Sequence, residues 1–394
     1  MKASSEIVIV GAARTPMGGM MGELGTVPAP QLGAVAIAAA LQRAGVTPER
    51  IDEVVMGCVL AAGIGQAPAR QAALAAGLPT GTGCTTVNKM CGSGMKALML
   101  AHDQLRAGSA EWMVAGGMES MSLAPYLLPK ARAGLRMGHA QLLDHMFFDG
   151  LEDAYEGGLM GTFAQQTADQ FGVSREAMDD FAIESLTRAR RAMAEGAFTE
   201  EIAAVPVEHK HDTVAVATDE QPGKARPEKI RRLKPAFASN GTVTAANSSS
   251  ISDGAAALVV TTAEQAGAQG IVPLVRIVGH ATHAQLPAEF TLAPIGAIQK
   301  LLDKVGWQVD EVDLFEINEA FAVVTLLAMN ELGLDAGKVN VNGGACALGH
   351  PIGASGARIV VTLLHALRRR GLKRGVAALC IGGGEATAMA LELM

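Results

Sequence analysis

An internal repeat is the feature that most constrains the fold of this chain. Four short sequence landmarks occur twice along its 394 residues, in the same order and about 260 to 270 residues apart. Ordered matches of this kind indicate a duplicated structural unit. The matched segments are residues 7–13 with 274–281, 51–56 with 309–315, 91–97 with 353–358, and 114–119 with 380–385.

The sequence pattern of each copy predicts strands that alternate with helices. Residues 7–10 are a continuous run of Ile and Val, typical of a strand that is buried on both faces. After Cys91, apolar side chains recur at helical spacing as far as Gly108, a residue suited to a helix C-terminus. A second helix is predicted from Gly353 to the cationic residues 368–370, just before Gly371. Only 4% of the residues are aromatic and 46 are glycine, which favours closely packed α/β layers.

Residues 122–250 have a different character, with amphipathic helical segments such as 176–195. We therefore predict an N-terminal half formed by residues 1–121 and 251–272, an inserted domain at 122–250, and a C-terminal half at 273–394. The insert contains a basic stretch, 224–234, in a chain whose net charge is −7. This stretch is either a solvated helix face or a surface for the phosphates of a nucleotide-containing ligand. The acidic balance argues against a general nucleic-acid-binding role.

Cys91 is the first candidate reactive residue. It stands where an apolar strand gives way to a predicted helix, directly before Gly-Ser-Gly. At a helix N-terminus, the dipole and the free backbone N–H groups favour the thiolate form of cysteine. The alternative is a buried structural cysteine.

His350 is the second candidate. It lies between Gly349 and Pro351 in a glycine-dense loop, where rigid backbone can position a general base. The alternative is a loop that cradles phosphate, but the spacing of the usual nucleotide-binding motifs is missing.

Cys380 and Asn318 each stand at the end of an apolar strand. Cys380, just before three glycines, is either a reactive thiol at a sheet edge or a packing residue. Asn318 either holds a catalytic water or caps the helix that follows. Because both residues and His350 lie in glycine-rich strand ends of the matched halves, we expect them to share one site with Cys91.

The five cysteines show no Cys-x-x-Cys spacing, which argues against a disulfide framework and against a zinc site. The first six residues lack the apolar run of an export signal. No stretch approaches the roughly 18–20 apolar residues that span a bilayer. We therefore expect a cytoplasmic protein with no bound metal and no membrane partner.

These residues lie in motifs that resemble the thiolase family over essentially the whole chain. Among thiolases, the chain is similar to acetyl-CoA C-acetyltransferases. The resemblance implies a five-layered αβαβα fold of two similar halves, an inserted loop domain and a homotetramer. The matching segments are residues 12–16, 87–94, 116–121, 240–245, 318–321, 349–351 and 380–382.

The resemblance also implies roles for the candidate residues. Cys91 would take the acyl group from a first CoA thioester while His350 accepts its proton, and Cys380 would deprotonate a second acetyl-CoA. Asn318 would hold a water that forms one oxyanion hole with His350, and the N–H groups of Cys91 and Gly382 would form the other. The implied reaction is the reversible condensation of two acetyl-CoA to acetoacetyl-CoA and CoA. CoA is then a substrate and a product, and no cofactor is expected.

Ligand contacts follow from the same resemblance. In this chain Leu159 replaces a histidine that is frequent in bacterial biosynthetic relatives, a change that bears on the choice of acyl chain. The implied contacts are Leu151, Met160, Ala245, Ser249, Ala320 and Phe321 for the pantetheine arm, with Lys224, Arg226 and Lys229 for the nucleotide.

Several other functions remain open at this level. One is a 3-ketoacyl-CoA thiolase that acts on longer chains. A decarboxylating condensing enzyme is another, although a second reactive cysteine at position 380 speaks against it. A Cys-His hydrolase would need only Cys91 and His350. A non-catalytic acyl or lipid carrier on the same fold is the alternative from a different class.

Overall fold

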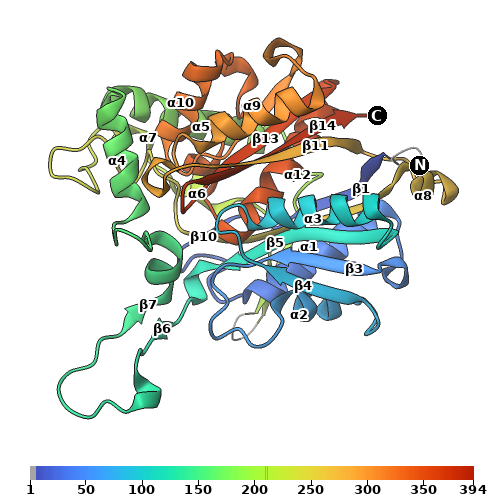
Figure 1. Ribbon diagram of the computed structural model, residues 1–394, viewed down its shortest axis with the longest axis horizontal. Helices are drawn as coiled ribbons and strands as arrows, with labels where there is room; N and C mark the ends of the chain where they lie inside the picture. The colour runs from blue at the N-terminus through green and yellow to red at the C-terminus, as the bar shows by residue number, and fades with distance from the viewer. Residues whose placement is uncertain (1–5, 209, 211) are drawn as a thin grey trace.

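The repeat in the sequence corresponds to two copies of one strand and helix pattern (Figure 1). The computed structural model describes residues 6–208, 210 and 212–394, so the first five residues, expected to lack an export signal, lie outside it. The first half contains β1 (Ile7–Arg14), β2 (Gly18–Gly19), α1 (Ala29–Ala44), β3 (Glu53–Gly57), α2 (Pro68–Ala75), β4 (Gly83–Val87), α3 (Ser93–Ala107), β5 (Trp112–Ser120), β10 (Ser252–Thr262) and α8 (Ala263–Ala268). The second contains β11 (Val275–Ala284), α9 (Ala293–Val305), β12 (Leu314–Ile317), α10 (Ala322–Leu332), α11 (Ala345–Leu348), α12 (Ile352–Arg370), β13 (Arg374–Ile381) and β14 (Glu385–Leu393).

The strands form one hydrogen-bonded path in the order β12-β13-β14-β11-β1-β10-β5-β3-β4. The two halves meet where β1 pairs with β11, over three antiparallel residue pairs from Ile7↔Ile277 to Ile9↔Val275. In the first half, β4 adds a parallel edge strand beside β3. Its counterpart in the second half is a single parallel bridge, Phe315↔Val339. The side chain of Asn340 then bonds both the N–H and the carbonyl of Ile317, at 2.8 and 2.7 Å, and so replaces further strand pairing.

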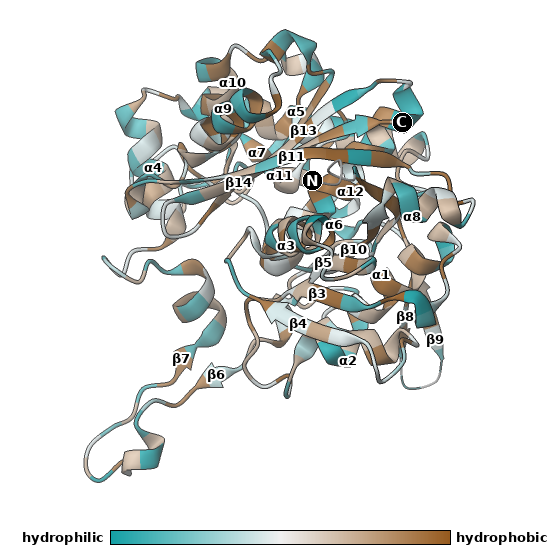
Figure 2. Ribbon diagram, turned by 45° about the vertical axis from the view of Figure 1, so that its right-hand side comes forward, coloured by the Kyte–Doolittle hydropathy of each residue, from teal (hydrophilic) through white to brown (hydrophobic). Residues whose placement is uncertain are grey.

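Five layers stack in the order helix, sheet, helix, sheet, helix, so the predicted αβαβα arrangement is confirmed. Helices α3 and α12 pack against each other between the strands of the two halves, through side chains such as Leu98 and Val360. Helices α1 and α2 cover the outer face of the first half, and α9 covers that of the second. Figure 2 shows the apolar strands enclosed by these helices. Burial on both faces explains continuous apolar runs such as that of β1.

The predicted ends of the two central helices are confirmed. Helix α3 begins two residues after Cys91 and ends at Gly108, which has φ 74°. Helix α12 ends at Gly371, with φ 63°. Both glycines adopt the left-handed conformation that only glycine reaches at little cost, which is why each helix ends there.

The segment between β5 and β10 supplies an arm and a helical cover. Its β6–β7 hairpin projects from the body of the molecule (Figure 1). Its helices α4 and α5 pack against α10 of the second half, and the amphipathic helix predicted at 176–195 is α5. Strand β10 then returns to pair with β1 and β5, and the proposed domain boundaries stay a prediction. The elements of this segment are β6 (Tyr126–Leu127), β7 (Leu143–Asp144), a π-helical turn (Phe147–Leu151), α4 (Met160–Gln170), α5 (Arg175–Ala194), β8 (Val205–Glu208), β9 (Thr213–Val216), α6 (Glu220–Lys224) and α7 (Pro227–Ile230).

Among the described residues, no helix combines the length and the apolar character needed to cross a membrane.

Candidate active site

A mostly apolar cavity of about 390 Å³ lies where the two halves meet the inserted segment. Cys91, His350, Cys380 and Gly382 all line it, although they come from widely separated parts of the chain. The predicted pantetheine contacts lie on its wall as well, namely Leu151, Met160, Ala245, Ser249, Ala320 and Phe321. The structure therefore brings together the candidates from the two matched halves and from the insert.

Cys91 occupies a tight turn between β4 and α3. Met90 has φ 48°, a left-handed conformation that is uncommon for a non-glycine residue. The Ser93 hydroxyl stabilises the turn, because it accepts the Lys89 N–H at 2.8 Å and donates to the Met90 carbonyl at 2.7 Å. A Cβ atom added to Gly92 would lie 2.3 Å from Ile381 Cδ1. Glycine at position 92 thus lets the Cys91 turn approach the end of β13.

Burial raises the pKa of Cys91 to about 11. The nearby backbone N–H groups of Gly382 and of Cys91 itself lower that pKa, but the loss of solvent outweighs them. The backbone N–H groups at the helix N-terminus thus favour the thiolate, as expected, but burial has the larger effect on the pKa. At neutral pH the residue is a thiol, and it needs a base to become a nucleophile.

His350 is placed to be that base. Its Nδ1 lies 2.6 Å from the Ser355 hydroxyl, which in turn donates to the Pro351 carbonyl at 2.9 Å. Because the single hydroxyl hydrogen is directed to the Pro351 carbonyl, the serine oxygen accepts from the imidazole, and we assign the ring proton to Nδ1. The other ring nitrogen, Nε2, has no partner in the described part of the chain. Burial, together with the positive charge of Arg358, lowers the pKa of His350 to about 3, so the ring is neutral and Nε2 carries a free lone pair.

Asn318 lies beside the imidazole of His350. Its side-chain nitrogen is 3.4 Å from His350 Nδ1, a contact between two donors and so no hydrogen bond when Nδ1 carries the proton, and its Oδ1 is buried with no partner among the described residues. The alternative that Asn318 caps the following helix is wrong, because the residue at the N-cap of α10 is Phe321. An unpaired amide oxygen beside the imidazole agrees with the predicted water site.

Cys380 is the second-last residue of β13, and Gly382 begins the turn into β14. Burial and the neighbouring Cys91 raise the pKa of Cys380 well above the usual value for a thiol. The two sulfur groups therefore lie close enough to influence each other electrostatically. The position of Cys380 on the cavity wall favours the reactive alternative over simple packing.

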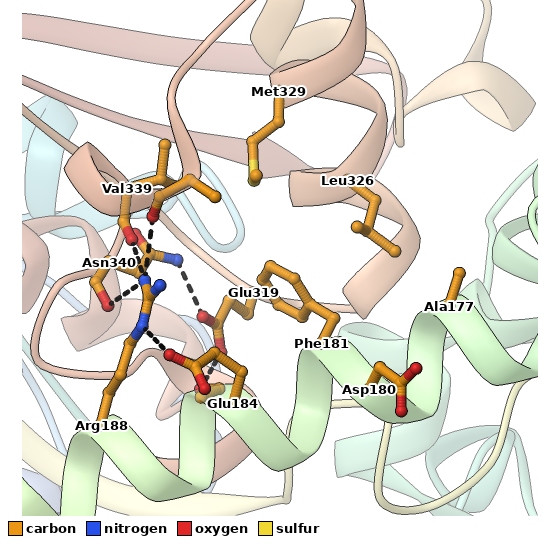
Figure 3. A pocket seen from close by; sticks show the side chains of 12 residues that line it. Ala177, Asp180, Phe181, Glu184, Arg188, Glu319, Leu326, Met329, Val339 and Asn340 are labelled. Atoms are coloured by element: carbon orange, nitrogen blue, oxygen red, sulfur yellow. Dashed lines mark hydrogen bonds and ion pairs between the residues drawn. The ribbon is translucent and has the colours of Figure 1, made fainter.

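Glu319 was not predicted from the sequence, although it is part of the Asn-Glu-Ala-Phe motif. It borders a separate pocket of about 290 Å³ between α5 and α10 (Figure 3). The buried carboxylate accepts from Ser185 Oγ at 2.7 Å, Asn340 Nδ2 at 2.9 Å and the Cys346 N–H at 3.0 Å. These bonds stabilise the turn that carries Asn318 from the side opposite the reactive cavity. Without the fold, a motif glutamate gives no sign of whether it reacts or supports a turn.

The predicted nucleotide contacts Lys224, Arg226 and Lys229 do not line the cavity. Their side chains are exposed, and Lys224 forms an ion pair with Glu220 one helical turn earlier. Their contact with a nucleotide stays a prediction.

One group of described residues has a donor set that can bind metal, formed by His102, Asp103 and His280. Asp103 Oδ1 already lies 2.9 and 3.0 Å from ring nitrogens of the two histidines. Burial lowers the pKa of both rings, Lys304 lowers both further, and Arg106 acts on His102; these two cations also oppose a dication. This cluster is a hydrogen-bonded bridge between α3 and β11, and we assign no metal to it.

Known proteins match the chain from end to end. Residues 7–264 match the family model "Thiolase, N-terminal domain", and residues 271–393 match "Thiolase, C-terminal domain". An acetyl-CoA acetyltransferase of Cupriavidus necator is 51% identical over 98% of this chain and 99% of its own. Acetyl-CoA acetyltransferase 2 of Arabidopsis thaliana is 52% identical over 99% of this chain and 97% of its own. The crystal structure of the Bacillus anthracis acetyl-CoA acetyltransferase superposes with a TM-score of 0.98 at 40% identity, and the match covers all of both chains.

Proposed function

Because the chain belongs to the thiolase family, we propose that it catalyses the reversible condensation of two acetyl-CoA molecules to acetoacetyl-CoA and CoA. One observation carries the proposal. The thiols of Cys91 and Cys380, the neutral imidazole of His350 and the Gly382 turn meet in a single cavity. Two thiols and one base are the groups needed for acyl transfer followed by carbon–carbon bond formation. A Cys-His hydrolase would have no use for Cys380, and a non-catalytic carrier would need none of the three.

The first half-reaction is acyl transfer. His350 Nε2 accepts the thiol proton of Cys91, and the sulfur attacks the thioester carbonyl of acetyl-CoA. The nearby N–H groups of Cys91 and Gly382 stabilise the charge on the carbonyl oxygen. The carbon–sulfur bond to CoA then breaks, and the departing thiolate takes the proton of the Cys380 thiol, while His350 keeps the proton from Cys91 on Nε2. The products are acetyl-Cys91 and free CoA.

The second half-reaction is a Claisen condensation. The Cys380 thiolate removes a proton from the methyl group of a second acetyl-CoA. The protonated Nε2 of His350 and a water held by Asn318 donate to the resulting enolate oxygen, and this donation makes a thiolate a sufficient base. The enolate carbon attacks the acetyl group on Cys91, and the bond between that carbonyl carbon and Cys91 breaks. Acetoacetyl-CoA leaves, and the Cys91 thiolate takes the proton back from His350, so that both cysteines are thiols again.

The cavity wall fits the pantetheine arm of CoA. Apolar side chains from the insert and from α10 form a narrow passage that leads to Cys91, including Leu151, Met160 and Phe321. We place the CoA nucleotide near Lys224, Arg226 and Lys229, whose cations suit its phosphates. CoA is substrate and product here, so the proposed reaction needs no cofactor.

The projecting arm supports a homotetramer. It exposes Tyr126, Leu128, Leu135, Met137 and Leu142, and Met137 is 98% exposed. Exposed apolar residues gathered on one arm usually mark a protein–protein contact. We infer that arms of neighbouring subunits pack together, and we place the assembled enzyme in the cytoplasm.

CoA-dependent cleavage of 3-ketoacyl-CoAs tests the proposed activity. We expect acetoacetyl-CoA to be cleaved with a kcat/KM at least about tenfold above that of six- to ten-carbon substrates, because one added methylene changes discrimination about tenfold or more. A preference for the longer chains would support the 3-ketoacyl-CoA thiolase alternative. Hydrolysis without acyl transfer to CoA would contradict the proposal.

A further inference from the structure

Glu119 and Glu385 occupy matched positions in the repeat, at the ends of Val-Ala-Gly-Gly-Met-Glu and Cys-Ile-Gly-Gly-Gly-Glu. In the structure, each carboxylate reaches across to a reactive loop of the opposite half. Glu119, at the end of β5 in the first half, bonds the start of α12 in the second. Glu385, at the start of β14 in the second half, bonds the turn before α3 in the first. The duplication has thus placed two carboxylates in equivalent cross-half contacts.

The contact that Glu119 makes with the opposite half is buried. Its Oε2 accepts the Gly353 N–H at 2.8 Å and the Val59 N–H at 3.0 Å, and its Oε1 accepts the Leu60 N–H at 3.1 Å. Gly353 lies three residues after His350. This carboxylate therefore positions the loop that carries the base.

Glu385 makes the corresponding contact with the nucleophile. Its carboxylate forms an ion pair with Lys89, two residues before Cys91. Glu385 also directly follows the turn that begins at Gly382, where Gly383 and Gly384 have φ 91° and 84°. This ion pair joins the turn that carries Cys91 to the turn of Gly382, which lines the same cavity and whose N–H lies near enough to lower the pKa of Cys91.

We propose that Lys89 and Glu385 are positioning residues that hold the Gly382 N–H against Cys91. Side-chain exposures of 20% and 35% mean that solvent screens the pair, so its effect on overall stability is small. Its effect on the reaction rate is larger, because a displacement of about 1 Å in an active site can cost about 100-fold in rate. Strand pairing of Ile381 with Glu385 and the bond from the Gln285 N–H to the Gly384 carbonyl fix the shape of this turn, and the ion pair adds a charged link from it to the Cys91 turn.

The test compares Lys89→Met and Glu385→Gln with the charge-reversed double variant Lys89→Glu/Glu385→Lys. We expect each single variant to lower kcat for thiolysis of acetoacetyl-CoA roughly five- to fiftyfold, with a less than twofold change in the KM for CoA. The double variant restores kcat to within about threefold of the wild type. Glu6→Gln is the matched control, because it removes the ion pair of Glu6 with Arg276, a similarly exposed contact far from Cys91 in the sequence.

A second measurement follows Cys91 directly. Loss of the Gly382 N–H from the sulfur raises the Cys91 pKa, so alkylation of Cys91 by iodoacetamide moves to higher pH in the single variants and returns in the double variant. The kinetic readout rests on the proposed function, whereas alkylation does not, so failure of one can be told from failure of the other. Single variants with wild-type alkylation profiles, or a double variant that is no better than the singles, would overturn the proposal.

Discussion

Nδ1 of His350 lies 2.6 Å from the hydroxyl oxygen of Ser355, a residue of α12 that is completely buried. Since that hydroxyl donates to Pro351, the contact fixes the proton on Nδ1 and leaves Nε2 as the basic nitrogen. The activation of Cys91 therefore depends on a residue that need not touch substrate.

Ser355→Ala should lower kcat for thiolysis about ten- to hundredfold, since a buried hydrogen bond contributes about 1–3 kcal/mol and each 1.4 kcal/mol is a factor of ten. The KM for CoA should change little. Thr362→Val is the control, because it removes another buried hydroxyl from α12 that bonds Glu201 and not the imidazole. Equal losses of kcat in the two variants would mean that Ser355 acts only through stability.

Variants of the two cysteines should divide the reaction into its halves. Cys91→Ala should form no acyl-enzyme and should show no thiolysis, because it removes the atom that carries the acetyl group. Cys380→Ala should still form acetyl-Cys91, visible by mass spectrometry, but should no longer exchange the methyl protons of acetyl-CoA with solvent. Retained thiolysis in the first variant, or unchanged exchange in the second, would contradict the assigned roles.

Features set by neighbouring residues, such as helix ends, could be predicted from the sequence. Features set by the packing of distant segments could not. The ends of α3 and α12 were predicted correctly because Gly108 and Gly371 terminate helices by their own conformational preference. The high pKa of Cys91 was not predictable, because burial by distant segments outweighs the local helix effect, whose direction the sequence did indicate. Ser355 and Glu119 were missed as supporting residues for the same reason. Their partners are set by how the two halves pack, and a single sequence does not display that packing.

The rate of alkylation of Cys91 should keep rising up to an unusually high pH. With a pKa of about 11, only about one thiol in a thousand is ionised at pH 8. The rate of reaction with iodoacetamide, followed on the Cys91 peptide by mass spectrometry, should therefore rise about tenfold per pH unit between pH 8 and 10. A plateau below pH 9 would show that the resting residue is a thiolate.

Glu119 should make the protein less stable as the pH rises. Burial raises the pKa of Glu119 to about 7, above the 4.5 of an unperturbed glutamate, so between these pH values the folded state binds a proton that the unfolded state has lost. Its contribution is therefore greatest below pH 4.5 and declines by about 3 kcal/mol as the pH reaches 7.

Urea unfolding of the wild type and of Glu119→Gln at pH 5 and pH 7.5 measures this contribution. The variant should lose less stability between the two pH values, whatever its absolute stability. The exposed Glu176→Gln serves as the control and should behave as the wild type. Equal losses in Glu119→Gln and in the wild type would show that Glu119 does not titrate in this range.

Met160 should limit the length of acyl chain that the enzyme accepts. Its sulfur lies beside Gly382, where an added Cβ would meet it at 3.5 Å, so the side chain occupies the end of the cavity at which the thioester reacts. Met160→Ala should enlarge that space and raise kcat/KM for a six-carbon 3-ketoacyl-CoA, relative to acetoacetyl-CoA, about tenfold. Met193→Ala, outside this cavity, should leave the ratio unchanged. If Met160→Ala remains active on acetoacetyl-CoA with an unchanged ratio, a different part of the wall selects the chain length.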